Sequence, residues 1–181
     1  MPDIVEVIKE QHQQVDELLE EATHDGVDKA ALLHEVHRLL LPHSEAEEAF
    51  VYPTIRAKAA EAGEDVVDGA VEHHQIEEML QNLLRGDPEA PGYDGTIAAI
   101  VGELRHHVEE EEEELLPILA ERLTPEEREE MGRRFIEATT GAMPGHEHHS
   151  RNELYDMARE QDIPGRSTMS KEELAEALGE A

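Results

Sequence analysis

Four segments of the chain carry the buried stripe of an amphipathic helix, and each stripe is apolar at both ends and polar in the middle. Apolar residues recur in each segment at alternating spacings of three and four, which places them on one face of an α-helix. The segments cover residues 3–22, 28–52, 64–84 and 96–120. The polar positions in the middle of the stripes are His12, then His43 and Glu47, then His73 and Glu77, and finally His107 and Glu111. Such helices can bury their stripes only against one another, which brings the polar positions to one level.

Glycine and proline separate the four segments, at Gly26, at Gly63 and between Gly86 and Gly95. Because these connections are short, consecutive helices should run antiparallel. No segment shows the strict alternation that is typical of a β-strand. The pattern therefore predicts an all-α fold with an antiparallel up-down-up-down four-helix bundle.

Two smaller units are predicted after the bundle. Thr124, Pro125 and Glu127 are typical of a helix start with a capping box, and they predict a short fifth helix. This helix completes a first domain of residues 1–140. Residues 141–149 are rich in histidine, glycine and proline and are interpreted as a linker. Residues 150–181 are predicted to form a small C-terminal helix-loop-helix, because capping boxes begin at Ser150 and Ser170.

The composition excludes several classes of protein. The chain of 181 residues has 45 Asp and Glu against 15 Lys and Arg, a formal charge of −30. Its outer faces should therefore be acidic, which argues against nucleic acid and anionic membranes as main partners. No apolar run is long enough to span a bilayer, and there is no cysteine for disulfides or thiolate metal sites. With no secretory signal at the start, we expect a cytoplasmic protein.

The two halves of the predicted bundle repeat one another. Residues 43–53 and residues 107–117 both fit the pattern His-x3-Glu-Glu-x4-Pro without a gap. His12 lies on the helix before the first pattern, and His73 lies on the helix before the second. Each half is therefore predicted to be a helical hairpin with one histidine on its first helix and a His-x3-Glu pair on its second.

These side chains predict a site for two metal ions. Residues four apart on a helix share one face, so each His-x3-Glu pair presents an imidazole and a carboxylate to the interior. One buried histidine is usually a hydrogen-bonded core residue, but two buried glutamates without Lys or Arg partners cost on the order of several kcal/mol. Two carboxylate-bridged metal ions are the simplest compensation, and this donor set suits iron, manganese or zinc. The candidate ligands are His12, His43, Glu47, His73, His107 and Glu111, with Glu77 as a seventh and Asp16 as the weakest.

The order and spacing of these residues resemble the hemerythrin-like (HHE cation-binding) domain family, over roughly residues 1–122. The resemblance implies a four-helix bundle with two non-haem iron ions that meet O2, peroxide or nitric oxide (NO). It implies bridging by the carboxylates of Glu47 and Glu111. It also implies that the iron ligands are His12, His43, Glu47, His73, His107 and Glu111.

Two positions depart from the pattern of the oxygen-carrying hemerythrins. Those proteins have a second histidine four residues after the ligand on the third helix, where this chain has Glu77. They have His-x4-Asp on the fourth helix, where this chain has His107-x3-Glu111. An additional carboxylate ligand favours Fe(III) over Fe(II). We therefore expect sensing or turnover of O2, peroxide or NO rather than reversible carriage of oxygen.

Three other functions stay open at this level. A peroxide-decomposing (catalase-like) di-iron enzyme would use the same ligands. A ferritin-like iron-handling bundle would use Glu-x2-His pairs, of which Glu103 with His106 is an example that lies off the buried stripe. A metal-free interaction module would need no ligands at all.

The C-terminal segment is similar to the small helix-loop-helix at the N-terminus of the transcription termination factor Rho. The similarity rests on Glu153-Leu154-Tyr155 and on Met169-Ser170-Lys171. Contact with nucleic acid is what such a unit implies. Its acidic residues outnumber Arg151, Arg159, Arg166 and Lys171, which argues against that contact.

Overall fold

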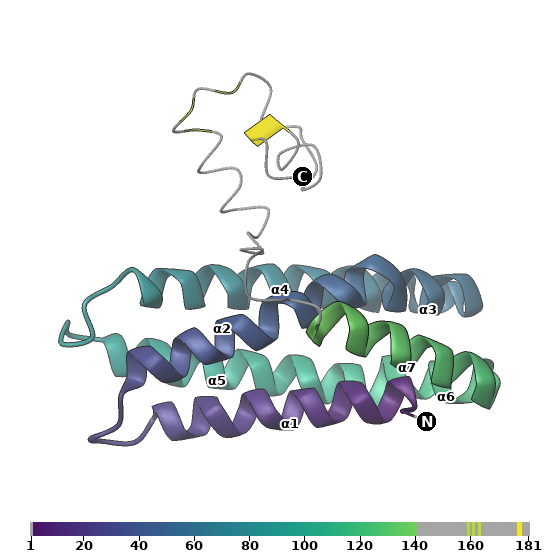
Figure 1. Ribbon diagram of the computed structural model, residues 1–181, viewed down its shortest axis with the longest axis horizontal. Coiled ribbons are helices and arrows are strands. Elements are labelled where there is room, and N and C mark those ends of the chain that lie inside the picture. Colours follow the sequence, from purple (N-terminus) through teal and green to yellow (C-terminus); the bar gives the residue numbers. More distant parts are fainter. Residues whose placement is uncertain (1, 141–158, 160, 162, 164–176, 179–181) are drawn as a thin grey trace. The chain divides into compact units, whose positions relative to one another are not determined.

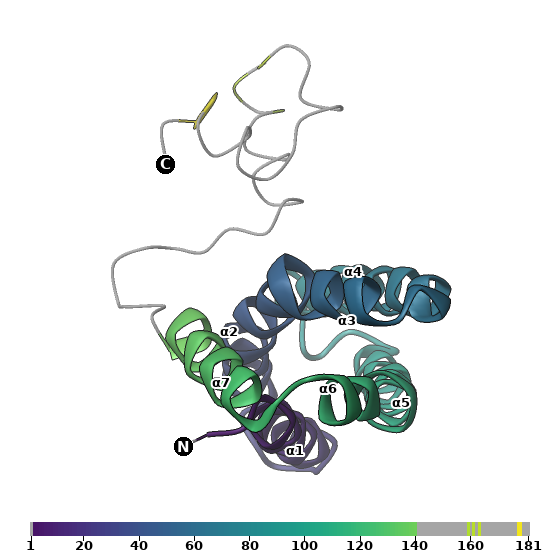
Figure 2. The same ribbon diagram turned by 90° about the vertical axis from the view of Figure 1, so that its right-hand side faces the viewer.

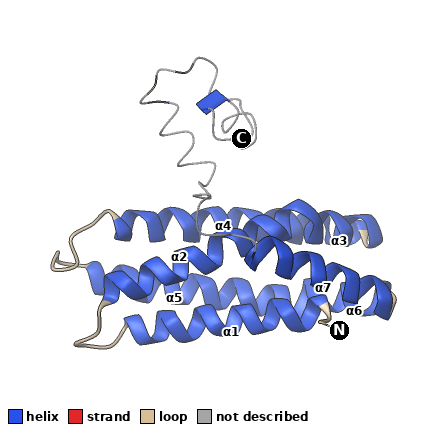
Figure 3. Ribbon diagram, in the orientation of Figure 1, coloured by secondary structure: helices blue, strands red, loops and turns tan. Residues whose placement is uncertain are grey.

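The computed structural model describes residues 2–140, 159, 161, 163 and 177–178. Residues 2–140 form one compact unit (Figure 1). Its elements are α1 (Ile4–Ala22), α2 (Lys29–Ala46), η1 (Glu47–Val51), α3 (Tyr52–Lys58), η2 (Ala60–Ala62), α4 (Gly63–Leu84), α5 (Tyr93–Glu110), η3 (Glu111–Leu115), α6 (Leu116–Arg122) and α7 (Pro125–Thr140). Every regular element in the described part of the chain is helical (Figure 3), so the predicted all-α class is confirmed.

Four long helical rods make up the bundle: α1, α2 continued by α3, α4, and α5 continued by α6. The chain turns back between consecutive rods (Figure 1). Figure 2 looks along the rods and shows them around a common interior, with α7 outside them against α1 and α2. No helix within the described ranges combines the length and the apolar character needed to cross a membrane. The predicted linker and C-terminal helix-loop-helix fall almost entirely outside the described residues and stay predictions.

Side-chain caps determine where several helices begin. Asp3 Oδ1 accepts a hydrogen bond from the backbone N–H of Val5 over 3.0 Å at the start of α1. Before α7, the backbone N–H of Glu127 donates to Thr124 Oγ1 over 3.2 Å, and the backbone N–H of Thr124 donates to Glu127 Oε2 over 2.8 Å. This reciprocal pair is a capping box, so the predicted start of the fifth helix is confirmed.

The interior consists of two apolar clusters with a polar layer between them. The first cluster includes Ile4, Ile8, Phe50, Ile55, Leu115, Leu119 and Phe135. The second cluster includes Val15, Leu19, Leu33, Val36, Ile76, Leu80, Ile97, Ile100 and Leu104. The polar layer holds His12, His43, Glu47, His73, His107 and Glu111, each at most 5% exposed. Along every rod the chain passes from one apolar cluster through this layer to the other, as the stripes predicted.

The elements η1 and η3 are single π-helical stretches that begin at Glu47 and Glu111. In each, the first residue after the stretch donates its backbone N–H five residues back, from Tyr52 to Glu47 and from Leu116 to Glu111. A proline follows in both cases. Because proline has no N–H, the carbonyl four residues before it loses its helical donor, and the helix widens there. The repeated sequence pattern thus produces the same irregularity twice.

The helix α7 covers the bundle beside His43. The ring of Phe135 is 0% exposed and packs edge-on against the imidazole of His43, with 5.3 Å between ring centroids. It packs in a similar way on Phe50, with 6.1 Å between centroids. One turn earlier, a Cβ atom at Gly132 would overlap the carbonyl oxygen of Pro2. The helix therefore approaches the start of the chain closely enough to require glycine.

We expect Phe135→Ala to lower the free energy of unfolding of the metal-free protein by about 3–5 kcal/mol, because it leaves a cavity that the neighbouring side chains fill only in part. Urea denaturation measures this change. The matched control is Glu137→Ala on the same helix, where only a solvent-screened ion pair with Arg133 is lost and the free energy of unfolding should hardly change. Equal losses in the two variants would show that Phe135 does not hold α7 on the bundle.

Candidate metal centre

Four buried histidines and Glu47 form two groups that share the glutamate. Ligand atoms of His12, His43 and Glu47 lie within 4.8 Å of one another, and so do those of Glu47, His73 and His107. Glu47 Oε1 is 3.1 Å from His43 Nε2, and Glu47 Oε2 is 3.2 Å from His73 Nε2. One carboxylate oxygen therefore faces each group, as in a bridging carboxylate.

Glu111 faces the same two groups from the second hairpin. Its Oε2 atom is 3.3 Å from Nε2 of His12 and 3.7 Å from Nε2 of His107. Glu47 and Glu111 occupy equivalent positions of the sequence repeat. The layer is therefore nearly symmetric, with two histidines and one glutamate from each hairpin.

Six inner atoms of this layer are polar, buried and without hydrogen-bond partners. They include Nε2 of His12 and His43 and both carboxylate oxygens of Glu47 and Glu111. Only imidazoles approach these two carboxylates at ion-pair distance among the described residues. Buried carboxylates of this kind are costly unless a cation compensates them. Imidazole nitrogens with carboxylate oxygens are a donor set for iron, manganese or zinc, so the residues present fit a metal-binding site.

The outer nitrogen of each imidazole is held by a neighbouring side chain. The Nδ1 contacts are His12 with Glu112 Oε1 at 3.1 Å, His73 with Glu48 Oε1 at 3.1 Å, His43 with Gln11 Oε1 at 2.9 Å, and His107 with Glu72 Oε2 at 2.9 Å. If Nδ1 carries the proton and donates to these oxygens, the lone pair of Nε2 faces the interior. The imidazoles are thus oriented for ligation by partners outside the layer.

These four supporting residues were not predicted from the sequence. Glu48 and Glu112 are the second glutamates of the repeated Glu-Glu pair, and Gln11 and Glu72 directly precede a candidate ligand. The repeat was therefore the available signal. Residues beside a buried position on a helix generally face solvent, so periodicity alone does not predict that these four contact the imidazoles.

Tyr52 adds a phenol to the layer that sequence analysis also missed. Its ring stacks on the imidazole of His73, with 5.6 Å between centroids and 7° between planes, and its Oη atom is 3.5 Å from His73 Nε2. Gly69 leaves space for this phenol, because a Cβ atom there would lie 2.9 Å from Oη. Burial raises the pKa of Tyr52, and the nearby carboxylates raise it further. The phenol therefore remains a neutral O–H group.

Two imidazoles are more basic than usual. Burial lowers the pKa of His12, but the neighbouring carboxylates of Glu111 and Glu112 outweigh this effect and raise it to about 9. Burial also lowers the pKa of His73, and neighbouring carboxylates, Glu47 first, raise it to about 10. Burial alone would raise the pKa of Glu47, but the facing imidazoles hold it well below its usual range.

The structure does not bring Glu77 or Asp16 into this layer. The buried face of α4 continues from His73 to Ile76, three residues on, so Glu77 turns to a half-buried position and accepts a hydrogen bond from Gln81 over 2.9 Å. Asp16 pairs with Arg105 over 2.6 Å on the outside of the bundle. Both had been candidates from sequence, and neither belongs to the two groups of ligand atoms.

Cavities lined by described residues reach the candidate ligands of the layer. One of about 120 Å³ lies between α4 and α5, and its buried wall contains His107 and Glu111. Its remaining wall is acidic, with Asp65, Asp68, Glu72, Glu110 and Glu114. A larger one of about 500 Å³ lies between α1 and α5 and reaches His12. An acidic entrance admits cations and neutral molecules and repels anions.

Comparison with known proteins agrees with this geometry. Residues 3–119 match the family model of the hemerythrin HHE cation-binding domain. The chain belongs to this hemerythrin family. The match covers the polar layer and both hairpins, so the resemblance seen in the sequence is confirmed. Membership of the HHE family and the grouped His and Glu side chains together identify a metal-binding helical bundle.

Two curated relatives are similar over part of their length. An uncharacterized hemerythrin-like protein of Schizosaccharomyces pombe is 30% identical over 112 residues, which are 61% of this chain and 55% of that protein. A DNA nickase of Nostoc sp. is 25% identical over 134 residues, which are 73% of this chain and 38% of that protein. The chain thus spans about half or less of the length of these relatives. No solved structure matches it.

The raised pKa values predict how the metal-free protein responds to pH. A histidine whose pKa is raised on folding stabilises the fold fully below its unfolded pKa of about 6.5, and this contribution is lost as pH rises through the folded pKa. The stabilisation is therefore lost between about pH 6.5 and about pH 9 for His12, and between about pH 6.5 and about pH 10 for His73. We expect the free energy of unfolding to fall by on the order of several kcal/mol across this pH range.

Urea denaturation of the metal-free protein at a series of pH values measures this decrease. The variant His12→Gln should show a shallower decrease than the wild type, because one of the two titrating groups is gone. A wild-type stability that stays constant from pH 6.5 to pH 10 would contradict the prediction.

Proposed function

We propose that the polar layer binds two non-haem iron ions and that this centre senses or reacts with O2, peroxide or NO. The observation that carries the proposal is the pair of buried glutamates. Their four oxygens lack hydrogen-bond partners, and each glutamate faces imidazoles of both groups. The proposed ligands are His12, His43, Glu47, His73, His107 and Glu111.

His12 and His43 would hold one iron ion, His73 and His107 would hold the other, and the carboxylates of Glu47 and Glu111 would serve both. Bound iron would supply the capacity to exchange electrons with O2, peroxide or NO. Because Glu77 lies outside the two groups of ligand atoms, the proposed ligand set has one imidazole fewer than that of the oxygen-carrying hemerythrins. A set richer in carboxylate relative to imidazole favours Fe(III), so we propose turnover or sensing rather than reversible carriage of oxygen.

The protein itself contributes orientation, exclusion of water and a proton. The supporting contacts to the outer nitrogens orient the imidazoles, and the two apolar clusters keep water away on either side. Tyr52 holds a proton at Oη, 3.5 Å from Nε2 of His73. The acidic wall of the cavity between α4 and α5 suits a neutral substrate such as O2, peroxide or NO better than an anion.

A peroxide-decomposing activity is the second candidate, and Tyr52 is the observation that favours it. Disproportionation of two peroxide molecules to O2 and two water molecules moves protons between oxygen atoms inside the site, and the buried phenol, which keeps its own proton, can donate a hydrogen bond there. Peroxide consumption by the iron-loaded protein, compared between wild type and Tyr52→Phe, distinguishes this enzyme from a sensor that binds without turnover.

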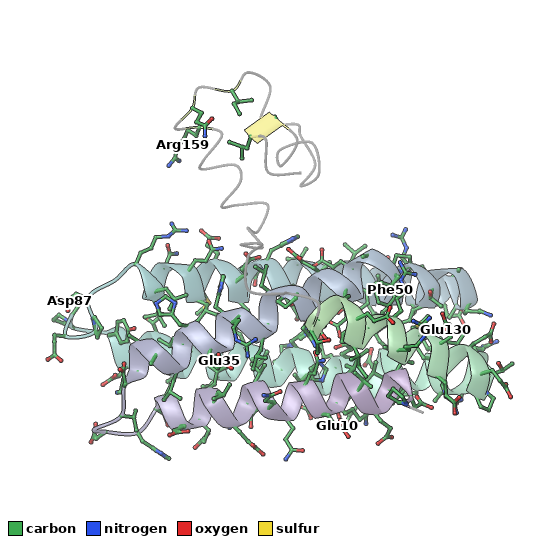
Figure 4. All side chains as sticks on the ribbon, in the orientation of Figure 1. Glu10, Glu35, Phe50, Asp87, Glu130 and Arg159 are labelled. Atoms are coloured by element: carbon green, nitrogen blue, oxygen red, sulfur yellow. The ribbon has the colours of Figure 1, made fainter. Side chains whose placement is uncertain are left out.

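The Nostoc relative is named a DNA nickase, but the charge of this bundle argues against DNA as its substrate. Acidic side chains such as Glu10 and Glu130 project from its outer faces (Figure 4). Binding of a phosphate backbone requires clustered Lys and Arg, and the chain has only 15 of these against 45 acidic residues. The proposal therefore stays with small molecules.

Iron quantitation tests the ligand assignment. We expect about two iron ions per chain in the wild type and a loss of both in His43→Ala/His107→Ala, because each metal position loses an imidazole. The matched control is His74→Ala/His106→Ala, which removes the neighbouring exposed histidines and should retain both ions. Equal iron content in the two double variants would refute the assignment.

An optical spectrum before and after addition of O2, peroxide and NO tests the reactivity. We expect at least one of these molecules to change the spectrum of the iron-loaded control variant His74→Ala/His106→Ala. The spectrum of His43→Ala/His107→Ala should not change. If the double ligand variant melts at the same temperature as the iron-loaded wild type, a metal-free interaction module becomes the better explanation of the fold.

A further inference from the structure

Two equivalent contacts in the polar layer differ in the charge of the side chain that contacts the imidazole. Gln11 precedes His12 and accepts a hydrogen bond from Nδ1 of His43 over 2.9 Å. Glu72 precedes His73 and contacts Nδ1 of His107 at the same distance of 2.9 Å. These contacts occupy matching positions of the two hairpins, but one acceptor is a neutral amide and the other is a carboxylate.

The other two supporting contacts do not differ in this way. His12 Nδ1 contacts Glu112, and His73 Nδ1 contacts Glu48, both at 3.1 Å. The pair of His73 and His107 is therefore supported by two carboxylates. The pair of His12 and His43 is supported by one carboxylate and one amide.

A contact with α7 keeps Gln11 in this orientation. Its Nε2 atom donates to Thr139 Oγ1 over 3.0 Å, so its amide oxygen is the atom that faces His43. The fifth helix packs on α1 and α2, and within the described residues the second hairpin has no corresponding cover. The difference between the two contacts thus belongs to the architecture and not to a freely rotating side chain.

We propose that Gln11 and Glu72 make the two metal positions unequal. This inference rests on the proposed function, since it concerns the two ions that the layer would hold. An imidazole that donates its N–H to a carboxylate becomes a stronger donor at its other nitrogen than one that donates to an amide. The position of His73 and His107 binds its metal ion more tightly and fills first, and the position of His12 and His43 fills second. Gln11 and Glu72 act as positioning residues through the imidazoles that they contact.

Titration of the full-length, metal-free protein with Fe(II) under anaerobic conditions tests this inequality. We expect the wild type to bind in two steps whose dissociation constants differ by about 10–100-fold, the usual effect of changing a supporting contact. Gln11→Glu should strengthen the weaker step, and Glu72→Gln should weaken the stronger step. In either single variant the dissociation constants of the two steps should therefore become more similar. Both substitutions preserve side-chain shape, so folding should be unaffected.

The exchange variant Gln11→Glu/Glu72→Gln provides the reciprocal test. It should restore two separated steps with the order of filling reversed. Paramagnetic shifts of the imidazole N–H signals at one equivalent of Co(II) report which position is filled. These signals should come from His73 and His107 in the wild type and from His12 and His43 in the exchange variant.

Charge-matched controls separate the hydrogen bond from simple attraction between charges. Asp68→Asn removes a charge from the same cavity wall as Glu72, and Asp68 belongs to no group of candidate ligand atoms. Gln14→Glu adds a charge to an exposed position of α1 close to Gln11. Both controls should change the two dissociation constants by the same factor, so that the ratio between them stays the same.

Two results would overturn the inference while leaving the proposed function intact. One is binding of both ions by the wild type in a single step. The other is a change of separation in the controls that equals the change in Gln11→Glu or Glu72→Gln. A wild-type protein that binds no Fe(II) or Co(II) would instead refute the proposed function itself.

Discussion

The burial of two carboxylates in the middle of an apolar bundle is the constraint on which the rest of this structure depends. Glu47 and Glu111 lie where water does not reach them, and the described residues approach them with imidazoles instead of Lys or Arg. Such a layer is tolerable only if positive charge is supplied, by protons on His12 and His73 in the metal-free protein or by metal ions. The same demand explains why every rod brings a histidine to one level.

The two residues of the repeated Glu-Glu pair approach different nitrogens of the imidazoles. Its first member faces the interior, and its second member, Glu48 or Glu112, lies about 100° further round the helix. From there each reaches the outer nitrogen of a histidine on the other hairpin. One dipeptide thus supplies a candidate bridge and a supporting contact, and it links the two hairpins to each other. The run of glutamates at this point is more than a solvated face.

Sequence periodicity predicted the rods, the two apolar ends and six residues of the layer, because a buried stripe leaves a clear signal at spacings of three and four. Glu77 lies half-buried outside the layer, because positions three and four after His73 lie almost equally close to its face and the apolar side chain of Ile76 takes the buried one. Tyr52 was missed for a different reason. It follows the π-helical stretch η1, which shifts the phase of the helix, and a count based on 3.6 residues per turn does not detect that shift.

The helix α7 gives a nearly symmetric ligand set unsymmetric surroundings. It places the ring of Phe135 against His43, which closes that side of the layer with an apolar group. On the second hairpin, the cavity between α4 and α5 reaches His107 and Glu111 through an acidic wall. Two metal ions with similar ligands would therefore differ in their access to neutral molecules and in the charge around them. A fold built from two similar hairpins can in this way assign different tasks to its two halves without changing the residues that bind the metal.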